Sequence, residues 1–101
     1  MKLSDEIINS LSINLRKKIK SIINDEVNIE EIRLRVNKPL IINGDSKDYF
    51  YNDKTSNLDL EMKNPYIVTK EDIEETFQII CKYSVHSFID DIKKGFITLR
   101  G

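Results

Sequence analysis

The chain has few of the residues on which many catalytic and metal sites depend. Its 101 residues include one cysteine, Cys81, one histidine, His86, and no tryptophan. A single cysteine excludes an internal disulfide and fits a reducing compartment. The three glycines, Gly44, Gly95 and Gly101, do not form a glycine-rich phosphate loop followed by lysine and serine or threonine. The sequence therefore holds no nucleotide site of that type.

Cys81 and His86 are too few for a metal centre. Each is the only residue of its kind, and their spacing is not the i,i+4 spacing that places two ligands on one face of a helix. We interpret Cys81 as a small core residue and His86 as a partly exposed residue at a helix junction. A small enzyme centred on His86 is an alternative, but no second catalytic partner stands out. We assign no catalytic, cofactor-binding or metal-binding residue.

Neither sign of charge is in excess, and long apolar runs are missing. The 16 basic and 17 acidic residues give a net charge of −1, so no strong field favours nucleic acid or an anionic membrane. No apolar run reaches the roughly 18–20 residues of a membrane span. The N-terminus turns acidic at once and lacks the apolar region of a signal peptide. We therefore expect one cytosolic domain that does not insert into a membrane.

The N-terminal segment, residues 4–23, has a helical pattern. Its apolar residues recur at three- and four-residue spacings, which is typical of an amphipathic helix. Ser4 and Ser12 are both suited to an N-cap. We predict either one bent helix or two helices broken near residues 10–12.

The centre of the chain predicts strands. Apolar residues at 32, 34 and 36 alternate with Arg33 and Arg35, so this stretch is a strand with one dry face and one wet face. A turn at Pro39 leads into a second strand at residues 40–42. The sequence Asn43-Gly44-Asp45 is a hairpin signal that precedes a third strand at residues 48–51. Residues 58–62 are a short edge strand or extended coil.

The C-terminal part predicts two helices and a strand. Thr69 is the N-cap of the first helix, with Asp72 in place of the usual glutamate or glutamine of a capping box. Its apolar face is expected at Ile73, Phe77, Ile80 and Cys81. A shorter helix follows over residues 88–94, with Gly95 just after its end. Residues 96–100 then form a strand, which we place at a sheet edge.

These elements predict an α+β domain over residues 1–101. Helices come first, followed by a small, mainly antiparallel sheet of three to five strands, with two further helices on one face of the sheet. Arg33 and Arg35 would lie on the wet face of a central strand. There they bind a phosphate or pair with acids of another domain, or else they pair with acids of this chain. A nucleic-acid-binding module is a further alternative.

That alternative would use Lys17, Lys18 and Lys20 together with the aromatic residues at 49–51. The balanced charge of the chain argues against it.

Two blocks of the sequence resemble the stage III sporulation protein AA family. Residues 30–40, EEIRLRVNKPL, are similar to the family's EEIRLRxxxPL signature. Residues 68–101 are similar to its second block, in which a threonine-capped helix leads through CxYS to GFIT. Here that block contains VTKEDI, CKYS and GFITLRG. Both blocks occur in the family's order and spacing, and Leu11-Ser12 replaces an expected Leu-Pro.

Members of this family resemble the ATPases of type II and type IV secretion and of pilus retraction. The resemblance implies that the chain is a non-catalytic N-terminal domain, with its ATPase motor domain outside residues 1–101. The motor domain would bind ATP and Mg²⁺, and no cofactor is expected in residues 1–101. Arg33, Arg35 and Arg100 are then candidates for contacts between domains.

The resemblance also implies the partners. They are the chain's own motor domain, the neighbouring subunits of a hexamer, and membrane proteins of the channel between mother cell and forespore. Nucleic acid is not among them. The location implied is the cytoplasm of the mother cell, at the membrane through these partners.

Overall fold

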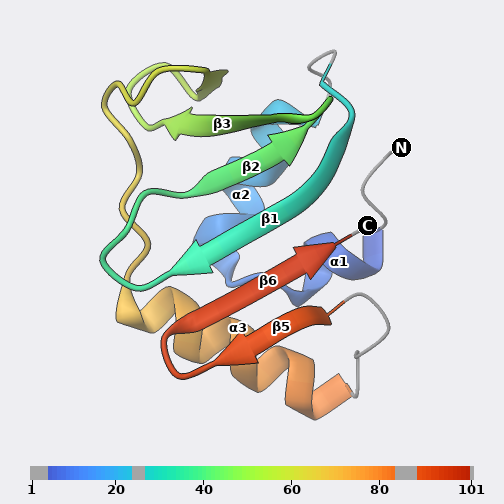
Figure 1. Cartoon of the computed structure of the whole chain (residues 1–101). Coiled ribbons are helices and arrows are strands. Elements are labelled where there is room, and N and C mark those ends of the chain that lie inside the picture. Colours follow the sequence, from blue (N-terminus) through green and yellow to red (C-terminus); the bar gives the residue numbers. More distant parts are fainter. Residues whose placement is uncertain (1–4, 24–26, 84–88, 101) are drawn as a thin grey trace.

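The alternating segment at the centre of the sequence forms the middle of a six-stranded antiparallel sheet (Figure 1). The computed structural model describes residues 5–23, 27–83 and 89–100, and the count of strands refers to these residues. The strands are β1 (Ile29–Arg35), β2 (Ile41–Gly44), β3 (Lys47–Asn52), β4 (Asn57–Asp59), β5 (Ile89–Lys93) and β6 (Phe96–Arg100). Their order in the sheet is β4-β3-β2-β1-β6-β5, so β1 is central, as predicted.

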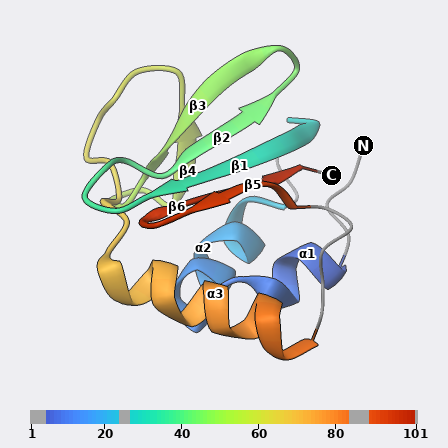
Figure 2. The same ribbon diagram turned by 60° about the horizontal axis from the view of Figure 1, so that its bottom comes forward.

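Three helices lie together on one face of this sheet (Figure 2). They are α1 (Asp5–Ser10), α2 (Ile13–Ile22) and α3 (Lys70–Tyr83). The core lies between the two layers and contains the predicted apolar stripe of the N-terminal segment and the dry faces of the strands. Its fully buried members include Leu15, Ile19, Ile32, Leu34, Ile42, Ile80, Ile97 and Leu99. The predicted α+β class is confirmed.

Ser12 separates the first two helices. Its backbone has φ −53° and ψ 156°, outside the helical region, and its Oγ accepts a hydrogen bond of 3.2 Å from the amide of Leu15. The side chain thus caps α2, as N-cap serines do. The prediction of two helices is confirmed, whereas Ser4 lies outside the described residues.

A reciprocal capping box begins α3. The Thr69 hydroxyl accepts a 3.0 Å hydrogen bond from the amide of Asp72, and the Asp72 carboxylate accepts a 3.2 Å hydrogen bond from the amide of Thr69. Both bonds expected of this motif are therefore made. The shorter aspartate serves here in place of glutamate.

The prediction of a helix over residues 88–94 is wrong. Residues 89–93 form β5, which pairs with β6, and Gly95 (φ 75°) lies in the two-residue turn between them. A bulge between Ile89 and Asp91 adds one residue to the strand, so Ile89 pairs with Leu99 and Ile92 pairs with Ile97. The bulge turns a two-residue strand spacing into the three-residue spacing that suggested a helix.

Two further expectations about the sheet change as a result. The sheet has six strands in the described residues instead of three to five, and a single helix follows β4. β6 lies between β1 and β5, so the expectation that it forms an edge is wrong. The edges are β4 and β5.

The apolar face of α3 is rotated relative to the prediction. Ile73 and Ile80 are buried, but Phe77 is 46% exposed and Cys81 is exposed. Polar Asp72 and Thr76 take the inward positions instead, because both bond to Ser12 at the start of α2. The assignment of Cys81 to the core is therefore wrong.

The β2–β3 hairpin turns one residue later than its sequence indicated. Gly44 pairs with Lys47, so the two turn residues are Asp45 and Ser46, with φ of 51° and 63°. Gly44 is needed for a different reason. A β-carbon there would lie 2.7 Å from the carbonyl oxygen of Asn28, which is too close for any other residue.

Replacing Ser46 with glycine is expected to raise the free energy of unfolding by about 0.5–1 kcal/mol, because glycine adopts a positive φ without steric cost. Urea denaturation of the chain measures this change. Ser46→Ala is the matched control: it also removes the hydroxyl but keeps the β-carbon, and we expect no gain from it. A glycine variant no more stable than the alanine variant would contradict the prediction.

Candidate functional site

The candidate site is the face of the sheet opposite the helices, which we call the open face (Figure 2). β1 contributes Glu31, Arg33 and Arg35, which alternate with buried Ile32 and Leu34. Residues paired across neighbouring strands point to the same side of a sheet. The open face therefore also includes Asn43 and Ile41 of β2, Asp48 and Phe50 of β3, and Phe96, Thr98 and Arg100 of β6.

Glu31 joins two of the predicted arginines. Its carboxylate accepts a hydrogen bond from Arg33 Nε and another, of 2.6 Å, from Arg100 Nη2. Only 6% of the residue is exposed. Burial alone would raise the pKa of Glu31, but the hydrogen bonds and charges of the two guanidinium groups outweigh it and hold the pKa below its usual value. Glu31 is thus a buried anion held between two cations.

Asp48 holds Arg33 from the other side. Its Oδ2 lies 3.2 Å from Arg33 Nη1, and its Oδ1 accepts a 2.9 Å hydrogen bond from Asn43. The bond from Asn43 and the charge of Arg33 lower the pKa of Asp48. Both carboxylates on this part of the open face therefore have partners within the chain.

Arg35 is placed differently from the other two arginines. It is exposed, and its guanidinium carbon lies 4.9 Å from the centre of the Phe96 ring. This is the arrangement of a cation–π contact. Among residues 5–23, 27–82 and 94–100, whose side chains the structure describes, none forms an ion pair with Arg35.

The structure brings all three predicted arginines onto one surface. The alternation of β1 predicted this for Arg33 and Arg35, and the pairing of Glu31 with Arg100 adds the third. Arg33 and Arg100 pair with an acid of this chain, as one of the two alternatives predicted, whereas Arg35 does not. Sequence reasoning missed Glu31, although its position two residues before Arg33 already placed it on the same face.

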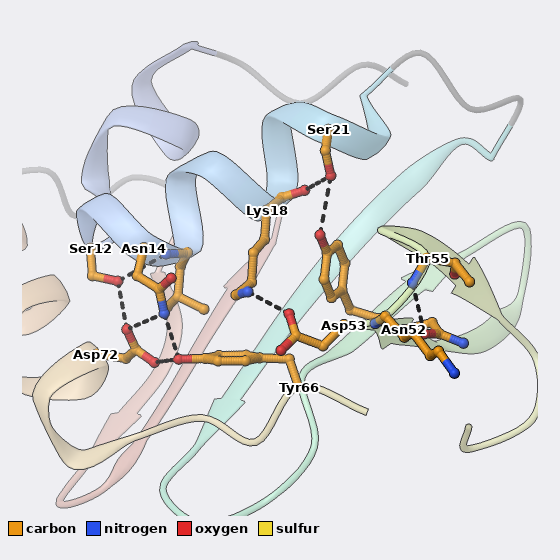
Figure 3. Close-up of polar contacts among 12 residues, drawn as sticks. Ser12, Asn14, Lys18, Ser21, Asn52, Asp53, Thr55, Tyr66 and Asp72 are labelled. Carbon is orange, nitrogen blue, oxygen red and sulfur yellow. Dashed lines mark hydrogen bonds and ion pairs between the residues drawn. The ribbon is translucent and has the colours of Figure 1, made fainter. Parts of the chain in front are cut away.

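A second polar cluster, which we call the Asp72 cluster, lies on the helical side (Figure 3). Asp72 is only 4% exposed and accepts hydrogen bonds from the hydroxyls of Ser12, at 3.0 Å, and of Tyr66. Asn14 donates to the Tyr66 oxygen at 2.6 Å, and the amide of Ser12 donates to Thr76 Oγ1 at 2.9 Å. These bonds join α2, α3 and the segment that precedes α3.

The Asp72 cluster borders a depression of about 410 Å³. Burial alone would raise the pKa of Asp72, but hydrogen bonds from Tyr66, Thr69 and Ser12 bring it below its usual value. Burial and the bond to Asp72 raise the pKa of Tyr66. Asp72 is thus ionised and Tyr66 protonated near neutral pH, and both carboxylate oxygens are occupied. The cluster is arranged as a joint between elements and not as a proton-transfer pair.

The structure does not assemble the basic and aromatic residues of the nucleic-acid alternative into one exposed surface. Lys18 pairs with Asp53 at 2.6 Å and lies 4.3 Å from the centre of the Tyr66 ring (Figure 3). Its side chain is 16% exposed. Tyr51 is 3% exposed, and its neighbour Phe50 lies on the opposite face of the sheet. Lys18, Phe50 and Tyr51 therefore do not form a row of exposed aromatic rings beside unpaired cations, as binding of single-stranded nucleic acid requires.

The remaining predictions concern His86, metal binding and membrane insertion. His86 lies outside the described residues. Within the described ranges, no group of three or more histidine, cysteine or acidic side chains is placed to hold a metal ion. No helix of the same ranges is both long enough and apolar enough to span a membrane.

Comparisons with known proteins give one match. A family model described as "Sporulation stage III, protein AA" matches residues 1–101, which is the whole sequence. Searches of curated proteins and of solved structures gave no match.

Proposed function

Because the chain belongs to the sporulation stage III protein AA family, we propose that it is a non-catalytic domain for assembly and coupling. In this proposal it is the N-terminal domain of a secretion-type ATPase, and ATP and Mg²⁺ are bound by the motor domain. Its partners are that motor domain, neighbouring subunits of a hexamer, and membrane proteins of the channel between mother cell and forespore. The similarity of the sequence blocks to that family supports this proposal.

The open face is the observation that supports the proposal most strongly. It is one side of a sheet on which no described helix lies (Figure 2), and it carries three guanidinium groups, two bonded to Glu31 and one against the Phe96 ring. Rigid elements hold a binding surface more accurately than loops do. Arginine also makes geometrically defined pairs with carboxylates at interfaces. We therefore place the contact with a motor domain at Arg33, Arg35 and Arg100.

Charge reversal on the open face of the longer ATPase tests the proposal. Arg35→Glu is expected to weaken subunit assembly and lower ATP turnover by about tenfold or more, because it places like charges against the partner's acids. Light scattering and phosphate release measure the two effects. The isolated chain with the same substitution should stay folded with only a small drop in its thermal midpoint, because Arg35 forms no ion pair with a described residue and loses only an exposed ring contact with Phe96.

Lys70→Glu is the matched control. It makes the same change of charge on α3, where Lys70 is 75% exposed in its side chain, and assembly should not change. Arg33→Glu is a less specific variant, because it would place a third acid beside Glu31 and Asp48 and disturb the fold. Wild-type assembly and turnover in Arg35→Glu would mean that the open face is not the coupling surface.

A further inference from the structure

The open face has a polar end and an apolar end. The polar end holds the ion pairs around Glu31. The apolar end lies toward the β1–β2 turn, where Pro39 forms a bridge with Ile67. Pro39 follows the same alternation as Ile41, because Leu40 between them is fully buried in the core. Ile67 is therefore on the open face too, and it is 44% exposed.

Aromatic and aliphatic residues lie on the same face as Arg35 at this end, and one of them, Phe96, contacts it. Phe96 lies directly across from it in the sheet register, and Ile41 pairs with the preceding outward residue of β1, Arg33. Phe50 pairs with Ile41 on the next strand. Each of these three apolar residues is partly exposed. An arginine among partly exposed apolar side chains has the composition typical of a binding hot spot.

Among Glu31, Asp48 and the three arginines, Arg35 alone has no ion-pair partner in the part of the chain whose side chains are described. Glu31 has both oxygens engaged by arginines, and Asp48 is engaged by Arg33 and Asn43. Arg35 contacts the Phe96 ring and forms no ion pair with a described carboxylate; it acts on Asp48 only at longer range, where its charge helps to lower the pKa of that acid. Its guanidinium stays charged and has five N–H donors, which match a carboxylate in a two-bond pair. Charge complementarity therefore calls for an anionic group beside apolar surface.

We propose that Arg35, stacked on Phe96, and the apolar end of the open face form a docking site for a protein segment that presents a carboxylate flanked by apolar side chains. Arg33 and Arg100, which are held by Glu31, lie beside this docking site and do not bind the carboxylate of the segment itself. A nucleic acid fits less well, because a single unpaired cation among apolar groups does not match a row of phosphates. The site rests on the proposed function only in that the motor domain would supply the segment.

Titration of the isotopically labelled 101-residue chain tests this site. The probe is a short capped peptide in which glutamates are flanked by leucines. Amide shifts should change at Arg35, Phe96, Ile41 and Ile67, with a dissociation constant of about 1 mM, as expected of a small ligand at one arginine site. Arg35→Glu should weaken binding at least tenfold, and Lys70→Glu should leave it unchanged.

Two further probes decide between the possible occupants. The same peptide with glutamine in place of glutamate should bind at least tenfold more weakly, and one with lysine should not bind. Equal binding of all three peptides, or none by the glutamate peptide, would overturn the docking site. Preferential binding of a DNA oligonucleotide at Arg35 would overturn it in favour of nucleic acid.

The two proposals can fail separately. If the glutamate peptide binds at Arg35 but Arg35→Glu leaves the longer protein's assembly unchanged, the docking site stands and the coupling role fails. If assembly depends on Arg35 but the peptides do not bind, the coupling role stands and the carboxylate segment is wrong.

Discussion

Replacing Asp72 with alanine is expected to lower the free energy of unfolding by about 3–4 kcal/mol, among the larger effects of a single substitution. The carboxylate is buried and accepts hydrogen bonds from the Ser12 hydroxyl, the Tyr66 hydroxyl and the Thr69 amide. Alanine leaves these donors without their acceptor in a place of low solvent access. Because Ser12 caps α2, Tyr66 and Thr69 lie in the segment before α3, and Asp72 belongs to α3, three parts of the fold lose a common anchor. Urea denaturation measures the loss.

The neighbouring acid provides the control. Glu71 lies in the same first turn of α3 but is exposed. Glu71→Ala should cost less than about 1 kcal/mol, mainly through its interaction with the helix dipole. A loss in Asp72→Ala no larger than in Glu71→Ala would mean that the Asp72 cluster does not hold the helices together.

The same carboxylate gives the stability a defined pH dependence. The pKa of Asp72 is lower in the folded chain than in the unfolded chain, so its contribution is complete above the unfolded value of roughly 3.9. The contribution is lost as the pH falls through the folded pKa. The difference in stability between the wild type and Asp72→Asn should therefore be constant from neutral pH to about pH 5 and shrink below pH 4. Glu31 is present in both chains, so its own low pKa cancels.

The parts of the fold that follow local rules could be predicted from the sequence. The alternation of β1, the cap at Ser12 and the capping box at Thr69 each depend on residues within a few positions of one another. β5 could not be predicted from the sequence, because its bulge gives the apolar residues of a strand the three-residue spacing that is typical of a helix. The turn between β2 and β3 was misplaced because Gly44 serves a close approach to Asn28 and not a positive φ.

The two polar clusters show why the candidate site was only partly predictable. The motif around Thr69 identified Asp72 as a capping residue, but its bond to Ser12 spans 60 positions. Glu31 bonds to Arg100 across 69 positions. Periodicity reports which way a side chain points and not what it meets there. The arginines could therefore be placed on one face, whereas the division between held and unpaired guanidinium groups required the structure.

Replacing Glu31 with alanine is expected to lower the free energy of unfolding by about 2 kcal/mol, through the loss of two charge-assisted hydrogen bonds. The expected loss is smaller than for Asp72. Arg33 and Arg100 keep 27% and 59% of their side chains exposed, so water can solvate part of each freed guanidinium group. Urea denaturation measures the change, and the arginine side-chain NMR signals should lose their distinct shifts as the two groups become mobile.

Asp48→Ala is the control for Glu31→Ala because it removes another acid that contacts Arg33. Its side chain is 46% exposed, and an exposed ion pair contributes about 1 kcal/mol or less. The ratio of the two losses therefore tests whether burial makes Glu31 the residue that fixes the arginines. Equal losses would mean that the open face is held by several weak surface pairs. A clearly larger loss in Glu31→Ala, with Arg35 still stacked on Phe96, would establish that Arg33 and Arg100 are held separately from the docking arginine.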